Sequence, residues 1–290
     1  MPTRPFRFGV SLLTPGSRSA WQARVRQAED LGYDVLQVPD HLGMPAPFPA
    51  LVSAAEATST MRVGTLVLNT GFYRPAVLAR DVAHTDQLTG GRLELGLGAG
   101  YMAAEFEAAE LPFPAPGRRI DHLAHTVEEL RRLFASEQHL PPVHQRPGPP
   151  LLLGGIGDRM LRLAAKEADI VGFPVMSIAT PPGADPRKVL AERIEFVRAE
   201  AGARFAGLEL NLFVSAVVLA DPGEADMTTM RRVAPTLTDE QILQMPNVLV
   251  GSERQIADTL IGYRETYGLT YFSVLEAHMT DFARVIAHLR

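Results

Sequence analysis

The chain of 290 residues contains no cysteine. This absence excludes disulfide bonds, thiolate metal sites, iron–sulfur clusters and a cysteine nucleophile. Lysine is nearly absent too, because only Lys166 and Lys188 occur among the 28 basic residues. Neither lysine follows a glycine-rich loop or ends an apolar strand, so we expect neither a P-loop nor catalysis by a lysine amine.

The sequence also lacks an excess of basic charge and a long apolar run. The formal net charge is −5, whereas nucleic-acid-binding domains usually carry a basic stripe, so we expect no nucleic-acid partner. No run approaches the roughly 18 apolar residues that a membrane helix needs. The N-terminus has no signal-peptide cleavage pattern. We therefore expect a cytoplasmic protein that does not bind membranes.

What is present is the composition of a folded domain, with 46% hydrophobic and 21% charged residues. Short apolar runs, which are typical of parallel strands buried on both faces, alternate with amphipathic helices. The predicted strands are residues 6–13, 35–39, 62–68, 93–98, 151–154, 170–173, 208–218 and 271–275. The predicted helices include residues 19–31, 76–88, 119–134, 158–167, 186–201 and 253–267.

Eight strands in strict alternation with helices predict an α/β fold, a (β/α)8 TIM barrel. A doubly wound open sheet is the alternative. The length suits a single barrel domain spanning residues 1–290. The weakly periodic segment 220–248 is expected to hold short helices or a lid. Proline-rich stretches, interpreted as loops, are residues 45–49, 112–116, 141–150 and 181–186.

Candidate site residues follow the predicted strands, because the active site of a barrel lies at the carboxyl ends of its strands. Asp40 and His41 end the second strand, where a carboxylate beside an imidazole suits proton transfer or a polar ligand. The same pair also suits a capped turn, in which Asp40 bonds backbone amides and His41 is merely exposed. After the third strand, Asn69, Tyr73 and Arg74 could line a polar pocket or form an ordinary loop before the next helix.

Glycines mark the next two strands. In the fourth strand, Gly96, Gly98 and Gly100 remove side chains where a flat ring or another backbone approaches closely, and tight packing within the barrel is the alternative. After the fifth strand, residues 154–157 form a glycine-rich turn before a helix, where free N–H groups and the helix dipole favour a phosphate. The alternative there is a simple turn with Asp158 as the helix cap.

The remaining titratable residues give weaker signals. Glu276 and His278 follow the last strand, so they belong either to the mouth or to the start of the final helix. His84, His122 and His125 lie within predicted helices and are expected to be surface or packing residues. No spacing of histidines and carboxylates suits a metal ion, so no metal site is expected.

Taken together, these motifs resemble the luciferase-like monooxygenase superfamily, and within it the branch of oxidoreductases that use the deazaflavin coenzyme F420. The most specific motif is residues 88–101, Leu-Thr-Gly-Gly-Arg-Leu-Glu-Leu-Gly-Leu-Gly-Ala-Gly-Tyr. Weaker motifs precede and follow it in the same order, so the resemblance covers nearly the whole chain. They are residues 8–10, 40–41, 73–80, 154–155, 163–165, 168–169, 250–252 and 267–269.

The resemblance implies a barrel with a flavin-type ring at its mouth. It implies catalytic roles for His41 and Tyr101, one of which would supply a proton. It also implies a non-proline cis peptide behind the ring, placed by alignment at Leu66–Val67. The family often forms dimers, so a homodimer is an expectation. The implied cofactor-binding residues are Asp40, Leu66, Val67, Asn69, Ala99, Gly100, Gly154, Gly155 and Ile156.

One departure from the family shapes the expected reaction. Deazaflavin-dependent sugar-phosphate dehydrogenases carry an acidic residue where this chain has Tyr101. We therefore expect their acid–base pair to be absent and sugar-phosphate oxidation to be disfavoured. The expected reaction is hydride transfer between F420 and a small, fairly apolar organic substrate. A reduced-FMN-dependent monooxygenase is the first alternative, and a barrel that binds a flavin or deazaflavin without catalysis is the second.

Overall fold

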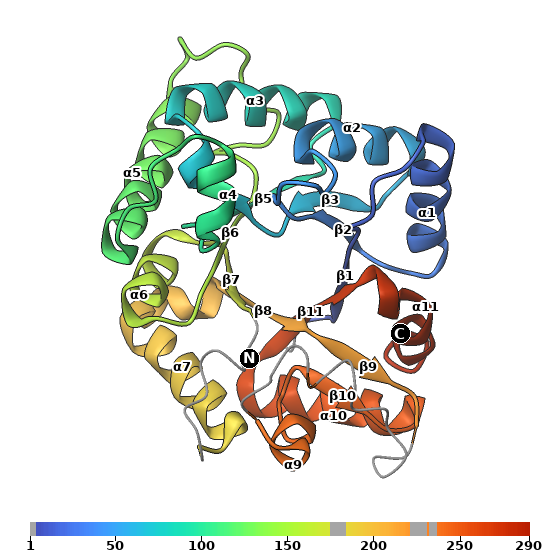
Figure 1. Ribbon diagram of the computed structural model, residues 1–290. Helices are drawn as coiled ribbons and strands as arrows, with labels where there is room; N and C mark the ends of the chain where they lie inside the picture. Colours follow the sequence, from blue (N-terminus) through green and yellow to red (C-terminus); the bar gives the residue numbers. More distant parts are fainter. Residues whose placement is uncertain (1–3, 175–183, 221–230, 232–236) are drawn as a thin grey trace.

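The computed structural model describes residues 4–174, 184–220, 231 and 237–290. Its centre is a ring of parallel strands, seen end-on in Figure 1. In pairing order, the strands are β3 (Arg62–Thr65), β2 (Val35–Val38), β1 (Arg7–Ser11), β11 (Leu269–Leu275), β8 (Glu209–Val214), β7 (Ile170–Phe173), β6 (Leu151–Gly154) and β5 (Leu93–Gly98). The ring closes where β3 pairs with β5, with Val63 opposite Leu93. The predicted (β/α)8 barrel is confirmed, and the open sheet is wrong.

The third strand of the barrel consists of two pieces. β3 ends at Thr65, a cis peptide bond joins Leu66 to Val67, and β4 (Leu68–Asn69) continues beside β5. The cis bond lies at the position that the family resemblance implies.

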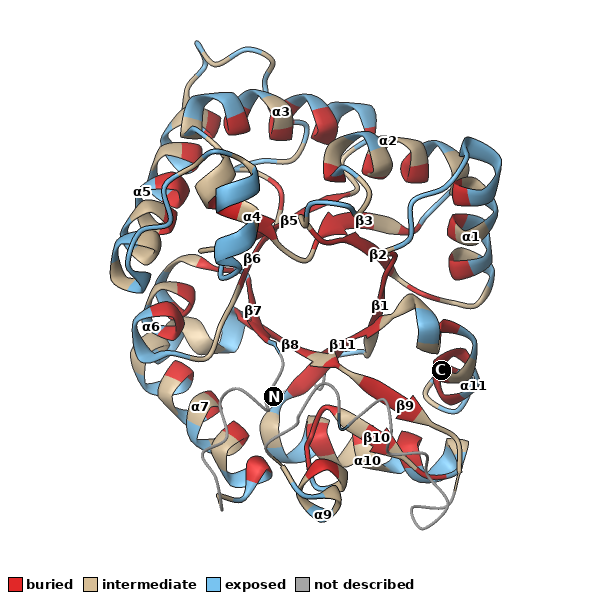
Figure 2. Ribbon diagram, viewed as in Figure 1, coloured by how far each residue is buried: buried red, intermediate tan, exposed pale blue. Residues whose placement is uncertain are grey.

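Helices surround the barrel, and their buried residues face it in Figure 2. A small sheet of β9 and β10 lies outside the ring. Among the described residues, no helix is long and apolar enough to cross a membrane. The helices and the small sheet are α1 (Arg18–Asp30), α2 (Pro47–Ala57), α3 (Pro75–Leu88), α4 (Ala103–Ala108), α5 (Pro116–Ala135), α6 (Asp158–Glu167), α7 (Pro186–Ala201), α9 (Asp239–Leu243), α10 (Glu253–Tyr267), α11 (Met279–Ile286), β9 (Ala216–Val218) and β10 (Val248–Val250). The 3-10 turns are η1 (Thr70–Phe72), η3 (Gly202–Gly207) and η5 (Glu276–His278).

Three predicted elements need correction. The stretch 45–49 is not wholly a loop, because α2 begins at Pro47, and proline suits the first helical position, where its missing N–H is not needed. The predicted strand 208–218 is interrupted, since β8 and β9 are separate and β9 pairs with β10 rather than with the barrel. Asp158 does not cap α6, because Gly157 occupies the cap position and Asp158 is the first helical residue.

The predicted segment 220–248 lies only partly within the described residues. α9 confirms a short helix in it, and Thr238 and Gln241 cap that helix by bonding each other's backbone N–H groups. The predicted lid falls on residues 221–230 and 232–236, which lie outside the described residues.

Charged side chains fill the barrel at the amino ends of its strands. Arg7 forms ion pairs with Glu94 and Glu209, whose carboxylates are almost fully buried. Arg62 also binds Glu94, with 2.7 Å between Nε and the carboxylate oxygen. The guanidinium of Arg7 lies 4.5 Å from the ring centre of the buried Tyr271. This end of the barrel is therefore a packed core, as barrel interiors generally are.

Candidate active site

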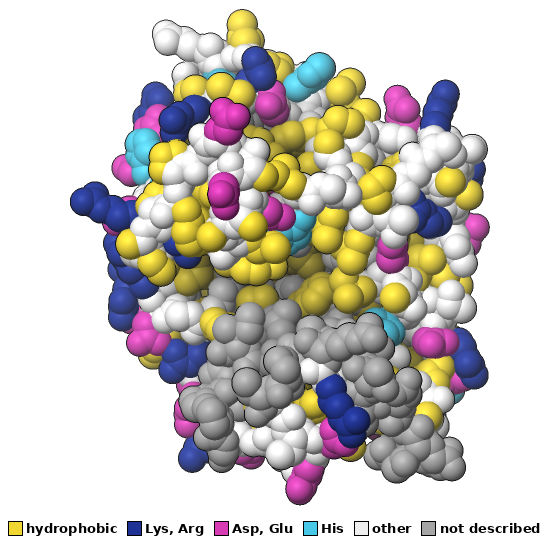
Figure 3. Space-filling view, viewed as in Figure 1, with side chains coloured by type: hydrophobic (Ala, Val, Ile, Leu, Met, Phe, Trp, Pro, Cys, Tyr) yellow, Lys and Arg dark blue, Asp and Glu magenta, His cyan; other side chains and the backbone are white. Residues whose placement is uncertain are grey.

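The mouth of the barrel, formed by the carboxyl ends of the strands, faces the viewer in Figures 1 and 3. α4 follows the carboxyl end of β5 and lies in front of the ring in Figure 1. In the same view, Figure 3 shows hydrophobic side chains around the middle of this face and charged side chains mainly toward its edge. The polar groups that the described residues place at the mouth are taken one by one below.

His41 is paired with a carboxylate at the mouth. Its Nδ1 lies 2.8 Å from Oε1 of Glu105, which also accepts a hydrogen bond from the backbone N–H of Leu42 at 3.3 Å. Because an ionised carboxylate only accepts hydrogen bonds, Nδ1 of His41 carries the hydrogen and Nε2 is left for a ligand. The alternative in which His41 is merely exposed is therefore wrong, since its side chain is only 24% exposed.

Glu105 is absent from the residues predicted above. It lies in the first turn of α4, four residues beyond the position at which related dehydrogenases carry their acidic residue. The position at which those dehydrogenases carry their acid is Tyr101 here, and α4 brings the later carboxylate of Glu105 to His41 instead. The available signal was an acidic residue one helical turn after the glycine-rich strand.

Tyr101, which is predicted to be catalytic together with His41, lies next to it. The two ring centres are 5.8 Å apart with the ring planes at 85°, an edge-to-face contact. The Tyr101 side chain is nonetheless 69% exposed and so remains open to a ligand. Partial desolvation and, second, the charge of Glu105 raise the pKa of Tyr101, so its phenol is protonated at neutral pH.

Asp40 joins the ends of the second and third strands. One oxygen of its carboxylate accepts the backbone N–H of Asn69 at 3.0 Å, and Tyr73 donates a side-chain hydrogen bond to it. Burial raises the pKa of Asp40 above its ordinary value, although these two hydrogen bonds act in the opposite direction. Asp40 therefore bonds a backbone amide, as the capped-turn alternative predicts, while Arg74 is exposed at the start of α3.

The glycines in and just after β5 lie against other parts of the chain. A Cβ on Gly96 would lie under 3.0 Å from the carbonyl oxygen of Thr65, and one on Gly98 would lie 2.6 Å from a methyl group of Val67. Gly100, whose φ is +71°, is similarly close to the side chain of Asn69. The tight-packing alternative is confirmed, because all three glycines accommodate β3, β4 and the residues between them.

The turn after β6 offers fewer amides to an anion than predicted. The N–H of Gly155 donates to the carbonyl oxygen of Gly172 at 3.0 Å, so this amide belongs to the barrel wall. α6, however, has Gly157 at its cap position and so no side-chain cap, which leaves its first N–H groups open. The carboxylate of Asp158 binds Arg193 on α7 and so does not satisfy them.

The other predicted titratable residues have structural partners. Glu276 accepts the backbone N–H of Leu13 at 3.2 Å and the hydroxyl of Thr14, which joins η5 to the end of β1. His278 is hydrogen-bonded to the backbone, and burial lowers its pKa. Nε2 of His122 lies 3.0 Å from the carbonyl oxygen of Thr70, as expected for a packing residue.

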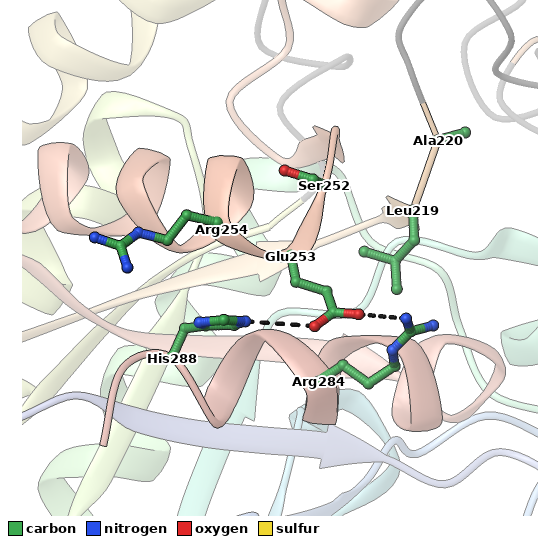
Figure 4. Close-up of a pocket in the computed structure, with 7 residues that line it drawn as sticks. All are labelled: Leu219, Ala220, Ser252, Glu253, Arg254, Arg284 and His288. Carbon is green, nitrogen blue, oxygen red and sulfur yellow. Dashed lines mark hydrogen bonds and ion pairs between the residues drawn. The ribbon is translucent and has the colours of Figure 1, made fainter.

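A cavity of about 460 Å³ lies elsewhere, between α10, α11 and the end of β9. Figure 4 shows Glu253 at its centre, bound to Arg284 and to Nε2 of His288, the latter at 3.4 Å. Arg254, which also lines the cavity, pairs with Asp258 at 3.3 Å. The charges around this cavity therefore have partners within the chain, and none of its lining residues belongs to the mouth.

Comparisons with known proteins agree with this geometry. The chain is 26% identical over 171 residues to a 5,10-methylenetetrahydromethanopterin reductase of Archaeoglobus fulgidus, covering 56% of this chain and 51% of that protein. It is 32% identical over 131 residues to an F420-dependent glucose-6-phosphate dehydrogenase of Amycolatopsis mediterranei, covering 42% and 39%. The chain therefore matches about half, or less, of the length of these curated relatives.

The fold also matches solved structures over almost its whole length. The coenzyme F420-dependent tetrahydromethanopterin reductase from Methanopyrus kandleri superposes with a TM-score of 0.78 at 17% identity, covering 99% of this chain and 100% of that one. The model of the family described as "Luciferase-like monooxygenase" matches residues 4–255. Since this match covers most of the chain, the protein belongs to the luciferase-like monooxygenase family.

Proposed function

We propose that the protein is an oxidoreductase that transfers a hydride between coenzyme F420 and a small, fairly apolar organic substrate. The observation that carries the proposal is the hydrogen bond between Nδ1 of His41 and Glu105 at the mouth, which leaves Nε2 for a proton. F420 is favoured because relatives of this chain bear F420 in their names. A bound deazaflavin would supply the donor or acceptor of the hydride.

The described residues fit the phosphate of such a coenzyme at the start of α6. The open N–H groups there and the positive end of the helix dipole favour an anion. Among the described residues, no atom lies within 4 Å of the position that a Cβ on Gly157 would take, so this part of the chain leaves the approach to these groups open. The N–H of Gly155 has its own partner, and we therefore assign it no part in binding.

In the proposed reaction, the chain's own groups hold and move a proton. Glu105 keeps the hydrogen of His41 on Nδ1, so Nε2 can take or give the proton that accompanies hydride transfer. The protonated phenol of Tyr101 is the second candidate proton donor, because its ring borders His41. The two groups that could transfer the proton therefore lie side by side at the mouth.

The substrate side of the mouth is apolar. Leu42, Tyr101 and Met102, which flank the His41–Glu105 pair in sequence, are large side chains left between 40% and 69% exposed. Phe113, at the end of the segment that follows β5, is exposed as well. Exposed apolar side chains around a reactive group favour an apolar ligand, whose binding would remove them from water.

A titration of the purified protein tests the proposal. F420 and FMN are added separately under identical conditions, and binding is followed by fluorescence. Micromolar or tighter binding of F420 alone supports the proposal, while a preference for FMN supports the reduced-FMN-dependent monooxygenase. Binding of neither coenzyme rejects both.

The variant Gly157→Asp tests the phosphate position. A carboxylate at the cap of α6 would bond the open N–H groups and repel a phosphate, so we expect FMN or F420 to bind about tenfold more weakly. Riboflavin, which has no phosphate, is the control and should bind the variant and the wild type alike. Equal weakening of riboflavin and FMN would show that the phosphate lies elsewhere.

A further inference from the structure

Residues 101–113, here called the α4 segment, leave the barrel after β5 and return to the start of α5. The segment carries both Tyr101 and Glu105 to His41. The geometry of the mouth therefore depends on how the two ends of this segment are held.

One side chain outside the segment binds both of its ends. Nε of Arg119, on α5, donates to the carbonyl oxygen of Gly100 at 3.0 Å, and Nη1 donates to the carbonyl oxygen of Pro114. The guanidinium also lies 4.2 Å from the ring centre of Phe113. A planar guanidinium can bond two carbonyl groups in fixed directions, which a lysine ammonium does not do.

The positive charge of Arg119 does not stabilise the helix in which it lies. It lies in the first turn after Pro116, where the helix dipole opposes a cation. Its hydrogen bonds go to carbonyl groups outside α5. The neighbouring Arg118, by contrast, is exposed. The contacts of Arg119 therefore act on the α4 segment rather than on α5.

The middle of the segment has an independent contact. Phe106 is buried and packs against Phe72 of η1 and against Phe113, with ring centres 5.4 and 5.0 Å apart. Gly71 leaves the space that the Phe106 ring occupies. Phe106 can keep the segment attached to the mouth, while Arg119 fixes the ends and so the direction in which Glu105 approaches His41.

From these contacts we infer that Arg119 is a positioning residue for the His41–Glu105 pair. The inference deepens the proposed function and rests on it for the catalytic role of His41. Loss of the two hydrogen bonds would let the α4 segment open while Phe106 still packs, and Glu105 would no longer hold the hydrogen of His41 on Nδ1.

The test compares Arg119→Met with Arg118→Met, its matched control on the same helical turn. Amide hydrogen exchange is measured at Ala109 and Leu111, whose N–H groups bond carbonyl groups within the segment. We expect exchange there to be roughly tenfold faster or more in Arg119→Met and unchanged in the control. The tautomer of His41, read from the nitrogen chemical shifts of its ring, should lose its preference for Nδ1–H.

Arg119→Lys keeps the charge and one donor group, so both effects should be intermediate. Unchanged exchange in Arg119→Met would overturn the inference. Faster exchange with an unchanged His41 tautomer would also overturn it, because Arg119 would then stabilise the segment without positioning the pair. Both measurements use the protein without coenzyme, so their failure is distinct from a failure of the coenzyme titration.

Discussion

The carboxylate of Glu105 should decide which nitrogen of His41 carries the hydrogen. The variant Glu105→Gln keeps the size of the side chain and removes its charge. A hydrogen bond to a charged group contributes about 1.5–3 kcal/mol and one between neutral groups about 0.5–1.5 kcal/mol. Both side chains are partly exposed, at 24% and 12%, so the lower part of the charged range applies. The substitution should therefore cost the Nδ1–H tautomer about 1 kcal/mol, which lowers the ratio of the Nδ1–H to the Nε2–H tautomer about fivefold.

Nuclear magnetic resonance of the ring nitrogens measures this population without any substrate. The chain has eight histidines, and the signals of His41 are those that disappear in His41→Gln. At a pH where the imidazole is neutral, the wild type should show mainly Nδ1–H and Glu105→Gln a mixture of both tautomers. Equal populations in the two proteins, or mainly Nε2–H in the wild type, would refute the assignment of Nε2 as the proton-carrying atom.

Four further substitutions should change the stability of the protein or its dependence on pH, measured by urea denaturation. Gly96→Ala places a Cβ against a backbone oxygen that cannot move away, so we expect a loss of about 3 kcal/mol, whereas Gly262→Ala, in open space within α10, should gain about 0.5–1 kcal/mol. Arg7→Met leaves the buried Glu209 without its cation and Glu94 with Arg62 alone, and should cost about 3–5 kcal/mol at neutral pH. His278 has a lowered pKa in the fold, so the unfolded chain binds its proton first as the pH falls below about 6.5. Stability should therefore fall more steeply below that pH in the wild type than in His278→Gln; equal slopes would contradict this.

The barrel could be predicted from the sequence because each of its strands is a short continuous segment and nearly all of them share one pattern. Runs such as residues 93–98 are buried on both faces, and their alternation with helices leaves few topologies. The location of the cis bond at Leu66–Val67 came from the family resemblance and not from any local propensity. The prediction of a loop over residues 45–49 is wrong at Pro47, because proline interrupts a helix interior but is favoured at the first helical position.

The site was harder to predict because its contacts join residues far apart in the chain. Glu105 meets His41 only after α4 follows β5, and an acidic residue one turn beyond the strand does not by itself identify its partner. The amide of Gly155 is engaged by Gly172 through the pairing of β6 and β7, which the glycine-rich turn alone does not indicate. The residue type at the end of a strand thus predicts where a polar group lies, but not whether that group is already hydrogen-bonded to another part of the chain.

The charged side chains at the amino ends of the strands affect the order in which ligands can bind and leave at the mouth. Because Arg7 and its two carboxylate partners fill that end, molecules that enter the barrel must arrive and leave through the same opening. Whatever lies deeper then has to enter first and depart last. If the proposed coenzyme is the deeper of the two ligands, steady-state kinetics should be ordered. The substrate should then bind productively only after the coenzyme, in the outer position.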